Sequence, residues 1–203
     1  MHPSPHSMLL SPLKAWTGLL VCVMVLAGCQ STQQSSVSVD YYKISGDSTA
    51  ALDSEIRKKG PKLNGGLHAI AIARIKMFPN ISYKRTNKGC EIADAKVAVD
   101  AKVTLPKWTG RETASGEMGE AWDNIDRYTR LHEATHVNIA FSYARKIEKS
   151  VLALKPVANC GDMRAITKRI VDNHLQDHDK AQKQFDADEQ ARFSMLAKRE
   201  PKN

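Results

Sequence analysis

The chain has 203 residues, of which 42% are hydrophobic and 26% are charged, with only 11 glycines and 8 prolines. This composition excludes collagen-like, low-complexity and wholly disordered chains, and it fits one compact domain. The net charge of +8 favours an anionic neighbour. The basic residues are scattered, however, and no aromatic residues interleave with a basic cluster, so the sequence does not support a nucleic-acid-binding protein.

The first 28 residues have the features of a secretory signal. Lys14 is their only charged residue, and it precedes an apolar stretch at 15–26. This stretch is shorter than the roughly 20 residues of a membrane-spanning helix, although an uncleaved anchor remains the alternative. The signal ends in Leu26-Ala27-Gly28-Cys29, which resembles the lipobox of bacterial lipoproteins. The resemblance implies that Cys29 carries a lipid and becomes the first mature residue.

The lipobox also implies a location. Gln30 follows the cysteine, and in bacteria with two membranes a residue other than Asp at this position usually permits transfer of a lipoprotein to the outer membrane. We therefore expect a lipid-anchored protein of the bacterial cell envelope, at the outer membrane and facing the periplasm. Residues 29–38 are polar and should form a flexible tether, and residues 39–203 should form a single domain. Met1 and Met8 are both possible starts, and the oligomeric state is not indicated.

Four cysteines are present, and two of them are accounted for at the amino terminus. Cys22 leaves with the signal and Cys29 takes the lipid, so Cys90 and Cys160 remain in an oxidising compartment. We expect a disulfide between them. By closing the loop it would raise the free energy of unfolding by about 4 kcal/mol in the chain-entropy model. The alternative is two free or metal-binding thiols, which lack the usual Cys-x-x-Cys spacing.

The first half of the domain has the hydrophobic pattern of strands. Residues 41–44 predict a short strand, and residues 48–59 predict a short helix that ends at the Gly-Pro pair after it. At 67–105 the apolar residues recur with a period near two, interrupted by turn signals at 79–80 and 87–89. This pattern predicts an antiparallel meander.

The second half has the pattern of helices. Apolar residues recur at steps of three and four, which predicts a helix from about Gly119 to Leu154. Its buried stripe should comprise Ile125, Tyr128, His132, His136, Ile139, Tyr143, Ile147, Val151 and Leu154. Asp162 is a candidate N-cap of a second helix, which continues through Phe185. In an antiparallel pair, residues whose numbers sum to about 317 should lie side by side. We expect an α+β fold, with a small antiparallel sheet packed on a long antiparallel helical hairpin.

The first long helix contains His132-Glu133-Ala134-Thr135-His136, an H-E-x-x-H motif. Residues four apart project from the same side of a helix, so both imidazoles can bind one Zn²⁺. Glu133 lies on the neighbouring edge, where it can take a proton from a zinc-activated water. Composition alone predicts ~0.01 such motifs in a chain of this length. The alternative is a pair of buried histidines in the core, which is costly without a partner.

A catalytic zinc needs a third protein ligand, and the second helix should supply it. The candidates are His178, Asp179, Asp186, Asp188 and Glu189. His178 lies on the apolar stripe, whereas Asp186 lies about 100° around the helix from Phe185. His174 and His178 repeat the spacing of the first histidine pair, so they either extend the site to a second metal or are polar residues at the edge of the stripe.

Several segments together resemble a bacterial family of predicted secreted zinc-dependent proteases, catalogued as a domain of unknown function. They are Tyr41-Tyr42-Lys43-Ile44-Ser45-Gly46, Leu105-Pro106-Lys107-Trp108, Leu131-His132-Glu133-Ala134-Thr135-His136 and Cys160. The resemblance covers about residues 39–190 and implies a zinc-dependent protease. Family members tend to carry Tyr-Asp-x-x-Thr-x-His-Gly in the last helix. Here Phe185-Asp186 matches the opening, but Glu189, Ala191 and Arg192 replace the Thr, His and Gly.

This departure leaves the third ligand open. If the family uses the Asp, Asp186 inherits the role; if it uses the His, this chain recruits another residue or has lost its metal. We take Asp186 as the third ligand and His178 as the alternative.

The sequence therefore predicts a zinc-dependent metallopeptidase that cleaves peptides or proteins. His132, His136 and Asp186 would bind Zn²⁺ and Glu133 would be the catalytic base. The 95–105 strand would bind an extended peptide along its edge, and Tyr128 or Tyr143 would either stabilise the oxyanion or belong to the core. Two alternatives remain: a non-catalytic envelope binding or assembly lipoprotein, and a zinc amidohydrolase acting on cell-wall peptides. Substrate specificity is not indicated.

Overall fold

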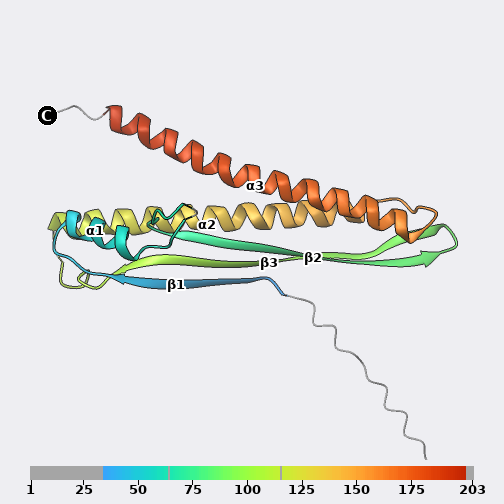
Figure 1. The fold of residues 1–203 in the computed structure, drawn as a ribbon, viewed down its shortest axis with the longest axis horizontal. Helices are drawn as coiled ribbons and strands as arrows, with labels where there is room; N and C mark the ends of the chain where they lie inside the picture. The colour runs from blue at the N-terminus through green and yellow to red at the C-terminus, as the bar shows by residue number, and fades with distance from the viewer. Residues whose placement is uncertain (1–33, 64, 115, 200–203) are drawn as a thin grey trace, which may run out of the picture. The chain divides into compact units, whose positions relative to one another are not determined.

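The computed structural model describes residues 34–63, 65–114 and 116–199. Along this part of the chain the elements are β1 (Ser36–Ile44), α1 (Thr49–Lys59), β2 (Ile72–Thr86), β3 (Gly89–Trp108), α2 (Gly116–Leu152) and α3 (Cys160–Arg199). The strands form one sheet, and the two long helices lie on the same face of it and contact each other (Figure 1). The predicted α+β fold, with a small sheet packed on a long helical hairpin, is therefore confirmed.

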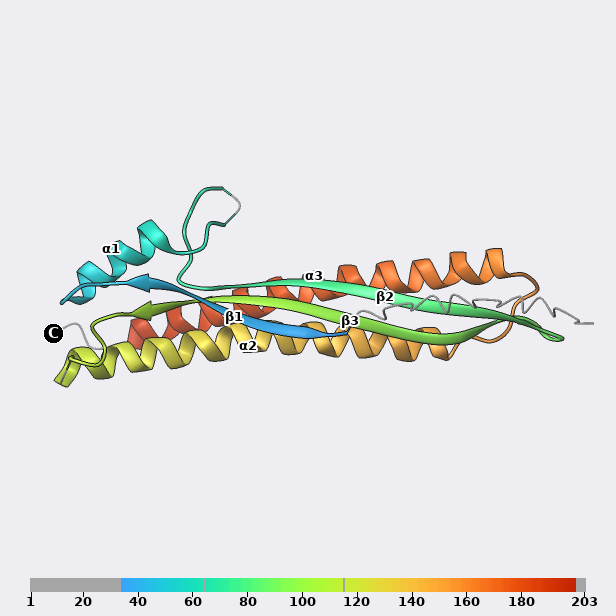
Figure 2. The same cartoon turned by 90° about the horizontal axis from the view of Figure 1, so that it is seen from below.

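The sheet is mixed, with the strand order β1-β3-β2 (Figure 2). β2 and β3 form a long antiparallel hairpin, whereas β1 pairs in parallel with the other side of β3, from Ser36 opposite Asp100 to Ile44 opposite Trp108. The expectation of a purely antiparallel sheet is therefore wrong at β1. Period-two alternation identifies strands but not the strands with which they pair. Parallel strands cannot be joined by a tight turn, and here α1 lies in the chain between β1 and the hairpin.

The central position of β3 also corrects the predicted peptide-binding edge. Residues 100–104 of β3 pair with β1 on one side and β2 on the other, and Leu105 pairs with β1. Nearer the turn, the backbone N–H groups of Val97 and Val99 donate to Glu148 Oε1 and Ser35 Oγ, at 2.8 and 2.9 Å. An extended peptide therefore cannot add along residues 100–104, and at 95–99 the N–H groups of Val97 and Val99 are already bonded. Among the described strands, β1 and β2 are the edge strands.

The short helix α1 has the predicted bounds. Ser48 is its N-cap, with a side-chain oxygen that accepts a hydrogen bond from the Ala51 N–H at 3.3 Å. The helix ends at Gly60, whose backbone N–H donates to the Ile56 carbonyl at 2.8 Å. Both ends are therefore stabilised by the signals visible in the sequence.

The two long helices run antiparallel, in the register expected for them. Tyr128 hydrogen-bonds Glu189, and His136 hydrogen-bonds Gln182, so facing residues agree with the predicted level to within one position. Asn159 caps α3, because its Oδ1 accepts from the Asp162 N–H at 2.9 Å. The candidate N-cap Asp162 is thus wrong, because the N-cap lies three residues earlier than predicted.

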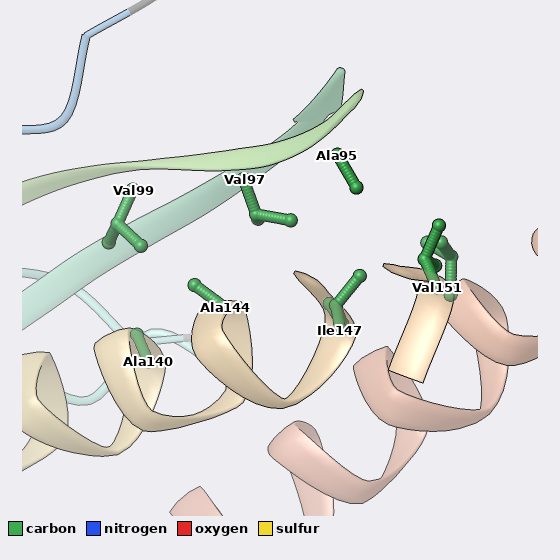
Figure 3. Packing of buried hydrophobic residues seen from close by; sticks show 8 residues of the cluster. Ala95, Val97, Val99, Ala140, Ala144, Ile147 and Val151 are labelled. Atoms are coloured by element: carbon green, nitrogen blue, oxygen red, sulfur yellow. The ribbon is translucent and has the colours of Figure 1, made fainter. Parts of the chain in front are cut away.

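The core between helix and sheet explains why α2 lies along β3. Ala140, Ala144, Ile147 and Val151 follow one another at steps of four, three and four, so they form one stripe on α2. This stripe packs on the inward-facing side chains of Ala95, Val97 and Val99 (Figure 3). The small alanines let the helix approach the sheet closely, and the branched residues fill the remaining space.

The predicted buried stripe of α2 is wrong in part, because the helix has two neighbours. The fully buried side faces the sheet and includes Thr129, Glu133 and Val137, none of which belongs to the predicted stripe. The stripe with His132 and His136 faces α3 instead, and Ile125 is 43% exposed. The apolar pattern of the helix therefore merged two different faces into one stripe: the face that packs on the sheet and the face that packs on α3.

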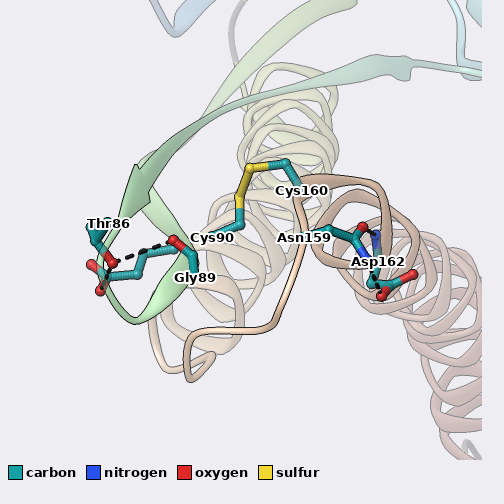
Figure 4. The surroundings of a disulfide bond; sticks show 7 residues. Thr86, Gly89, Cys90, Asn159, Cys160 and Asp162 are labelled. Carbon is teal, nitrogen blue, oxygen red and sulfur yellow. Dashed lines mark hydrogen bonds between the residues drawn. A yellow bond between two sulfur atoms is a disulfide. The ribbon is translucent and has the colours of Figure 1, made fainter.

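A disulfide joins Cys90 at the start of β3 to Cys160 at the start of α3, as predicted (Figure 4). Cys90 also exchanges two backbone hydrogen bonds with Val157, at 2.7 and 3.0 Å. Gly89 is required beside it, since its φ is +114° and a Cβ there would lie 2.2 Å from the Val157 carbonyl oxygen. A structural disulfide is typical of oxidising compartments, so this one indicates a protein located outside the cytoplasm.

The predicted signal at 1–28 and the lipidated Cys29 lie outside the described residues. β1 begins at Ser36, so residues 36–38 of the predicted tether belong to a strand. Within the described part of the chain, no helix combines the length and apolar character needed to cross a bilayer.

Candidate metal centre

The H-E-x-x-H motif lies in the middle of α2, and α3 supplies an acid opposite it. His132 and His136 are one helical turn apart and both face α3, where Asp186 Oδ1 lies 3.3 Å from His132 Nε2 and 3.0 Å from His136 Nε2. The two Nε2 atoms are 3.1 Å apart. These three residues form the His132–His136–Asp186 cluster, which is the group of potential metal ligands found among the described residues.

The spacing of the cluster matches a tetrahedral metal site. When bonds to nitrogen and oxygen are about 2.0–2.1 Å long, two ligands of a tetrahedron are about 3.3 Å apart. The three distances in the cluster are 3.0, 3.1 and 3.3 Å. Two imidazoles and one carboxylate are also the donor set of many catalytic zinc sites, so these residues fit a zinc ion in both chemistry and geometry.

The hydrogen-bond partners of His136 orient its lone pair toward the cluster. Gln182 Nε2 lies 3.0 Å from the His136 carbonyl oxygen, which can only accept, so this nitrogen donates. The other atom of the amide, Oε1, lies 2.6 Å from His136 Nδ1 and must accept from it. The proton of the neutral ring is therefore on Nδ1, and Nε2 keeps the lone pair that a metal needs.

His132 has the same arrangement. The Tyr128 hydroxyl donates its single proton to Glu189 Oε2 at 2.8 Å, so toward His132 Nδ1, 3.4 Å away, its oxygen can only accept. His132 Nε2 is then also a lone-pair atom facing the cluster. Three acceptors converge without a donor among them, an arrangement that a cation between them would stabilise.

Burial favours the neutral form of the His132 imidazole. Desolvation lowers the pKa of His132, and the neighbouring His136 lowers it further. A neutral ring is the form that binds metals. The side chains of His132 and His136 are 21% and 13% exposed, so both remain in contact with the solvent-facing cleft.

Glu133 is the most deeply buried member of the site, at 5% exposure. It projects toward β2, where the backbone N–H of Ala73 hydrogen-bonds its carboxylate. Burial raises the pKa of Glu133, although the His136 ring and the Ala73 N–H oppose the rise. A carboxylate with a raised pKa beside two ligands is suited to accept and return a proton.

A cleft of about 520 Å³ opens above these residues. One wall is polar and carries His132, Glu133, His136 and Asp186. The opposite wall comes from the edge strand β2 and the segment before it and is made of small or apolar side chains: Leu63, Ala69, Ala71, Ile72, Ala73 and Ile75. The polar groups thus face an apolar surface across a space large enough for part of a peptide.

A family model described as a bacterial protein of unknown function, DUF922, matches residues 39–193. The chain belongs to this family. The matched region contains the whole cluster, Glu133 and both cysteines of the disulfide. Comparison with curated proteins and with solved structures found no match. Membership of DUF922 therefore names the family, and the chemistry has to be inferred from the site.

The alternative ligand His178 is not part of the cluster in this DUF922 chain. Its Nε2 lies 2.8 Å from Gln182 Nε2, and its Nδ1 lies 3.0 Å from Asp179 Oδ1. His174 bonds Ser150 Oγ at 2.9 Å instead of joining His178. The proposed second metal pair is therefore not assembled among the described residues. Sequence reasoning missed Gln182, although the predicted register placed position 181 opposite His136.

The two tyrosines considered as oxyanion groups serve other contacts. The Tyr128 hydroxyl lies on the Nδ1 side of His132, away from the cluster, and burial together with Glu189 raises its pKa to about 12. Tyr143 lies with its ring 5.8 Å from that of His178. The carboxylate of Glu189 accepts hydrogen bonds from Tyr128 and Arg192. It therefore contacts the site through Tyr128 and does not face the cleft.

Phe185 closes the apolar side of the cluster. Its ring centroid lies 4.9 Å from that of His132 and 5.0 Å from that of His136. The residue before Asp186 therefore packs on both imidazoles while Asp186 itself reaches their Nε2 atoms. Asp186 points at the cluster although its side chain remains 57% exposed.

Proposed function

We propose that the chain is a zinc-dependent metallopeptidase of the bacterial cell envelope. The observation that supports this proposal best is the convergence of His132 Nε2, His136 Nε2 and Asp186 Oδ1 at 3.0–3.3 Å, beside the buried carboxylate of Glu133. A structural zinc would need a closed shell of four protein ligands. The cluster has three, and it opens on a cleft, which is typical of a catalytic site.

His132, His136 and Asp186 would hold the metal, and Glu133 would move the proton. A bound Zn²⁺ would supply Lewis acidity, lowering the pKa of a coordinated water to about 7 and polarising the scissile carbonyl. Glu133 takes the proton of the attacking water and then transfers it to the leaving amine. The raised pKa of Glu133 suits both steps, because the residue must be a base first and an acid afterwards.

The free edge of β2 would hold the substrate. β2 pairs with β3 on one side only, and Ile72, Ala73 and Ile75 border the cleft from that strand. An extended peptide that pairs with this edge would lie between the apolar wall and the cluster. This role was expected for β3, and it passes to β2 because β3 is the central strand.

The cell-envelope location extends the same proposal. The lipobox-like sequence ending at Cys29 supports a lipid anchor, and the disulfide supports an oxidising compartment. From Cys29 to the first residue of β1 there are seven residues, which span at most about 25 Å when fully extended. The peptidase would therefore act close to the membrane surface, at the outer membrane and facing the periplasm.

The test is hydrolysis by the zinc-loaded full chain and by its Glu133→Gln variant. A set of unstructured peptides and cell-wall peptides serves as substrate. The parent chain should cleave unstructured peptides, and Glu133→Gln should lose about 10²–10⁴-fold in rate, the usual contribution of general acid–base catalysis. Glu120→Gln, at an exposed position of the same helix, is the matched control and should keep full activity.

Three results would contradict the proposal. Undiminished turnover in Glu133→Gln would exclude this residue as the base. Stoichiometric zinc without cleavage of any substrate would favour a binding or assembly protein, whereas cleavage confined to cell-wall peptides would favour an amidohydrolase.

A further inference from the structure

We propose that His178 and Gln182 are positioning residues that fix the imidazole of His136 in its metal-binding orientation, and that His178 is not a ligand. This inference rests on the metal centre proposed above. It concerns two polar side chains of α3 that the proposed chemistry does not use. His178 is only 7% exposed, so its ring nitrogens need hydrogen-bond partners inside the protein.

The hydrogen bonds of Gln182 determine those of His178. One N–H of the Gln182 amide donates to the His136 carbonyl, at 3.0 Å. The second N–H is directed at His178 Nε2, at 2.8 Å, so this ring nitrogen must accept. The proton of a neutral His178 is then on Nδ1, which donates to Asp179 Oδ1 at 3.0 Å. Every polar atom along this path has a partner of the correct kind.

These hydrogen bonds select one of the two orientations of the Gln182 amide. If the amide rotated by 180°, its NH₂ group would face His136 Nδ1, and its oxygen would face both the His136 carbonyl and His178 Nε2. Two acceptor pairs would then oppose each other, and His136 Nδ1 would have to lose its proton to Nε2. His136 would no longer present a lone pair to the metal, so the amide orientation determines whether it can be a ligand.

Among these hydrogen-bonded residues, His178 is the one that prevents rotation of the Gln182 amide. Its ring is buried between α2 and α3, with the Tyr143 ring centroid 5.8 Å away and Lys146 Nζ 4.0 Å above that tyrosine ring. Asp179 is 72% exposed in its side chain, so water can replace it. The buried acceptor at His178 Nε2 is therefore the feature that holds the amide, together with the His136 carbonyl.

The place of these hydrogen bonds relative to the cluster distinguishes a positioning residue from a metal ligand. Gln182 contacts His136 at Nδ1, the atom opposite Nε2 on the ring, and His178 contacts Gln182. His178 lines the cleft but does not belong to the group of potential ligands whose atoms lie within 4.8 Å of one another. Its effect on a metal must therefore pass through Gln182. Partners of this kind usually change metal affinity by about 10–100-fold.

The experiment measures zinc affinity of the full chain by competition with a chromophoric chelator. His178→Phe keeps a buried ring but removes the acceptor, and it should weaken zinc binding at least 10-fold. His178→Gln can place an oxygen near the former Nε2, and it should stay within about 3-fold of the parent. His174→Phe is the matched control, since His174 is one turn away on α3 and bonds Ser150 instead of the site; its affinity should not change.

A double variant separates positioning from ligation. Gln182→Met removes the amide, so adding His178→Phe to it should cause no further loss of zinc affinity. The visible spectrum of the Co²⁺-loaded chain should keep its intensity in His178→Phe, because the number of ligands is unchanged. A further loss in the double variant together with a changed Co²⁺ spectrum would make His178 a ligand and overturn the inference.

Other outcomes are equally decisive. Equal zinc affinity of the parent and His178→Phe would overturn the positioning role while leaving the metal centre intact. If His178→Phe fails to fold, the comparison of Gln182→Met with Gln182→Glu decides, because Glu keeps the acceptor for His136 Nδ1 and should bind zinc at least 10-fold more tightly than Met does. A parent chain that binds no zinc would overturn the metal centre and this inference together.

Discussion

Asp186 Oδ1 of α3 lies 3.0 Å from His136 Nε2 of α2, so the candidate metal centre is shared between two helices. Its geometry therefore depends on the register of the helical hairpin and not on the H-E-x-x-H motif alone. The register is held on either side of the site by the Gln182 amide on His136 and by the Tyr128 hydroxyl on Glu189. A shift of one residue in α3 would turn Asp186 by about 100° away from the cluster.

The first prediction concerns Asp186 itself. Asp186→Asn keeps the size of the side chain but removes the negative charge, so zinc affinity should fall by more than 10-fold. Asp188→Asn is the control, because Asp188 is exposed and bonds Gln184 on the same helix. Affinity is measured by chelator competition. Equal zinc binding by Asp186→Asn and the parent would show that the third ligand is another group.

The second prediction concerns stability with and without metal. A ligand that binds only the folded chain raises the free energy of unfolding, by about 2.7 kcal/mol at a concentration 100 times its dissociation constant. Thermal unfolding of the full chain should therefore shift upward with zinc and return after chelation. Glu133→Gln should keep this shift, because Glu133 is not a ligand, whereas His136→Ala should abolish it. A zinc-dependent shift in His136→Ala would contradict the cluster as the binding site.

The sequence predicted the parts of the fold that depend on local signals. The cap at Ser48, the bounds of α1 and the break near Asn159 follow from residue types at short spacing. The disulfide followed from a count, because Cys90 and Cys160 are the two cysteines left outside the signal and the lipobox. The register of the hairpin also followed, because two straight helices joined by a short connection leave little freedom. Asp186 could be placed opposite the motif for the same reason.

The parts that the sequence did not reveal depend on packing between distant segments. The parallel partner of β3 is β1, and alternation in either strand says nothing about which strands pair. The burial of Glu133 could not be predicted because α2 touches both the sheet and α3, and one helical pattern cannot separate two faces. Gln182 is a polar residue on a mostly polar helix, so its role is visible only through its contacts.

The third prediction concerns the disulfide. Replacing Cys90 and Cys160 together with serine should lower the free energy of unfolding by about 2–5 kcal/mol, measured by urea denaturation. The bond ties the β2–β3 turn to the first residue of α3, whereas Asp186 lies many turns further along that helix. Zinc affinity of the folded double variant should therefore stay within about 3-fold of the parent. A fall of 10-fold or more would show that the disulfide sets the register at the metal centre.

The last prediction concerns the apolar wall of the cleft. Ala69 lies on this wall, just before β2, and its side chain is small. Ala69→Phe should fill part of the space opposite the cluster and raise KM for peptide substrates, because the substrate loses room between wall and cluster. Zinc affinity should not change, since Ala69 lies on the apolar wall and not among the ligands. Thr109→Phe, outside the cleft, is a control for the added ring. If Ala69→Phe and the parent cleave peptides with equal kcat/KM, the substrate does not occupy this side of the cleft.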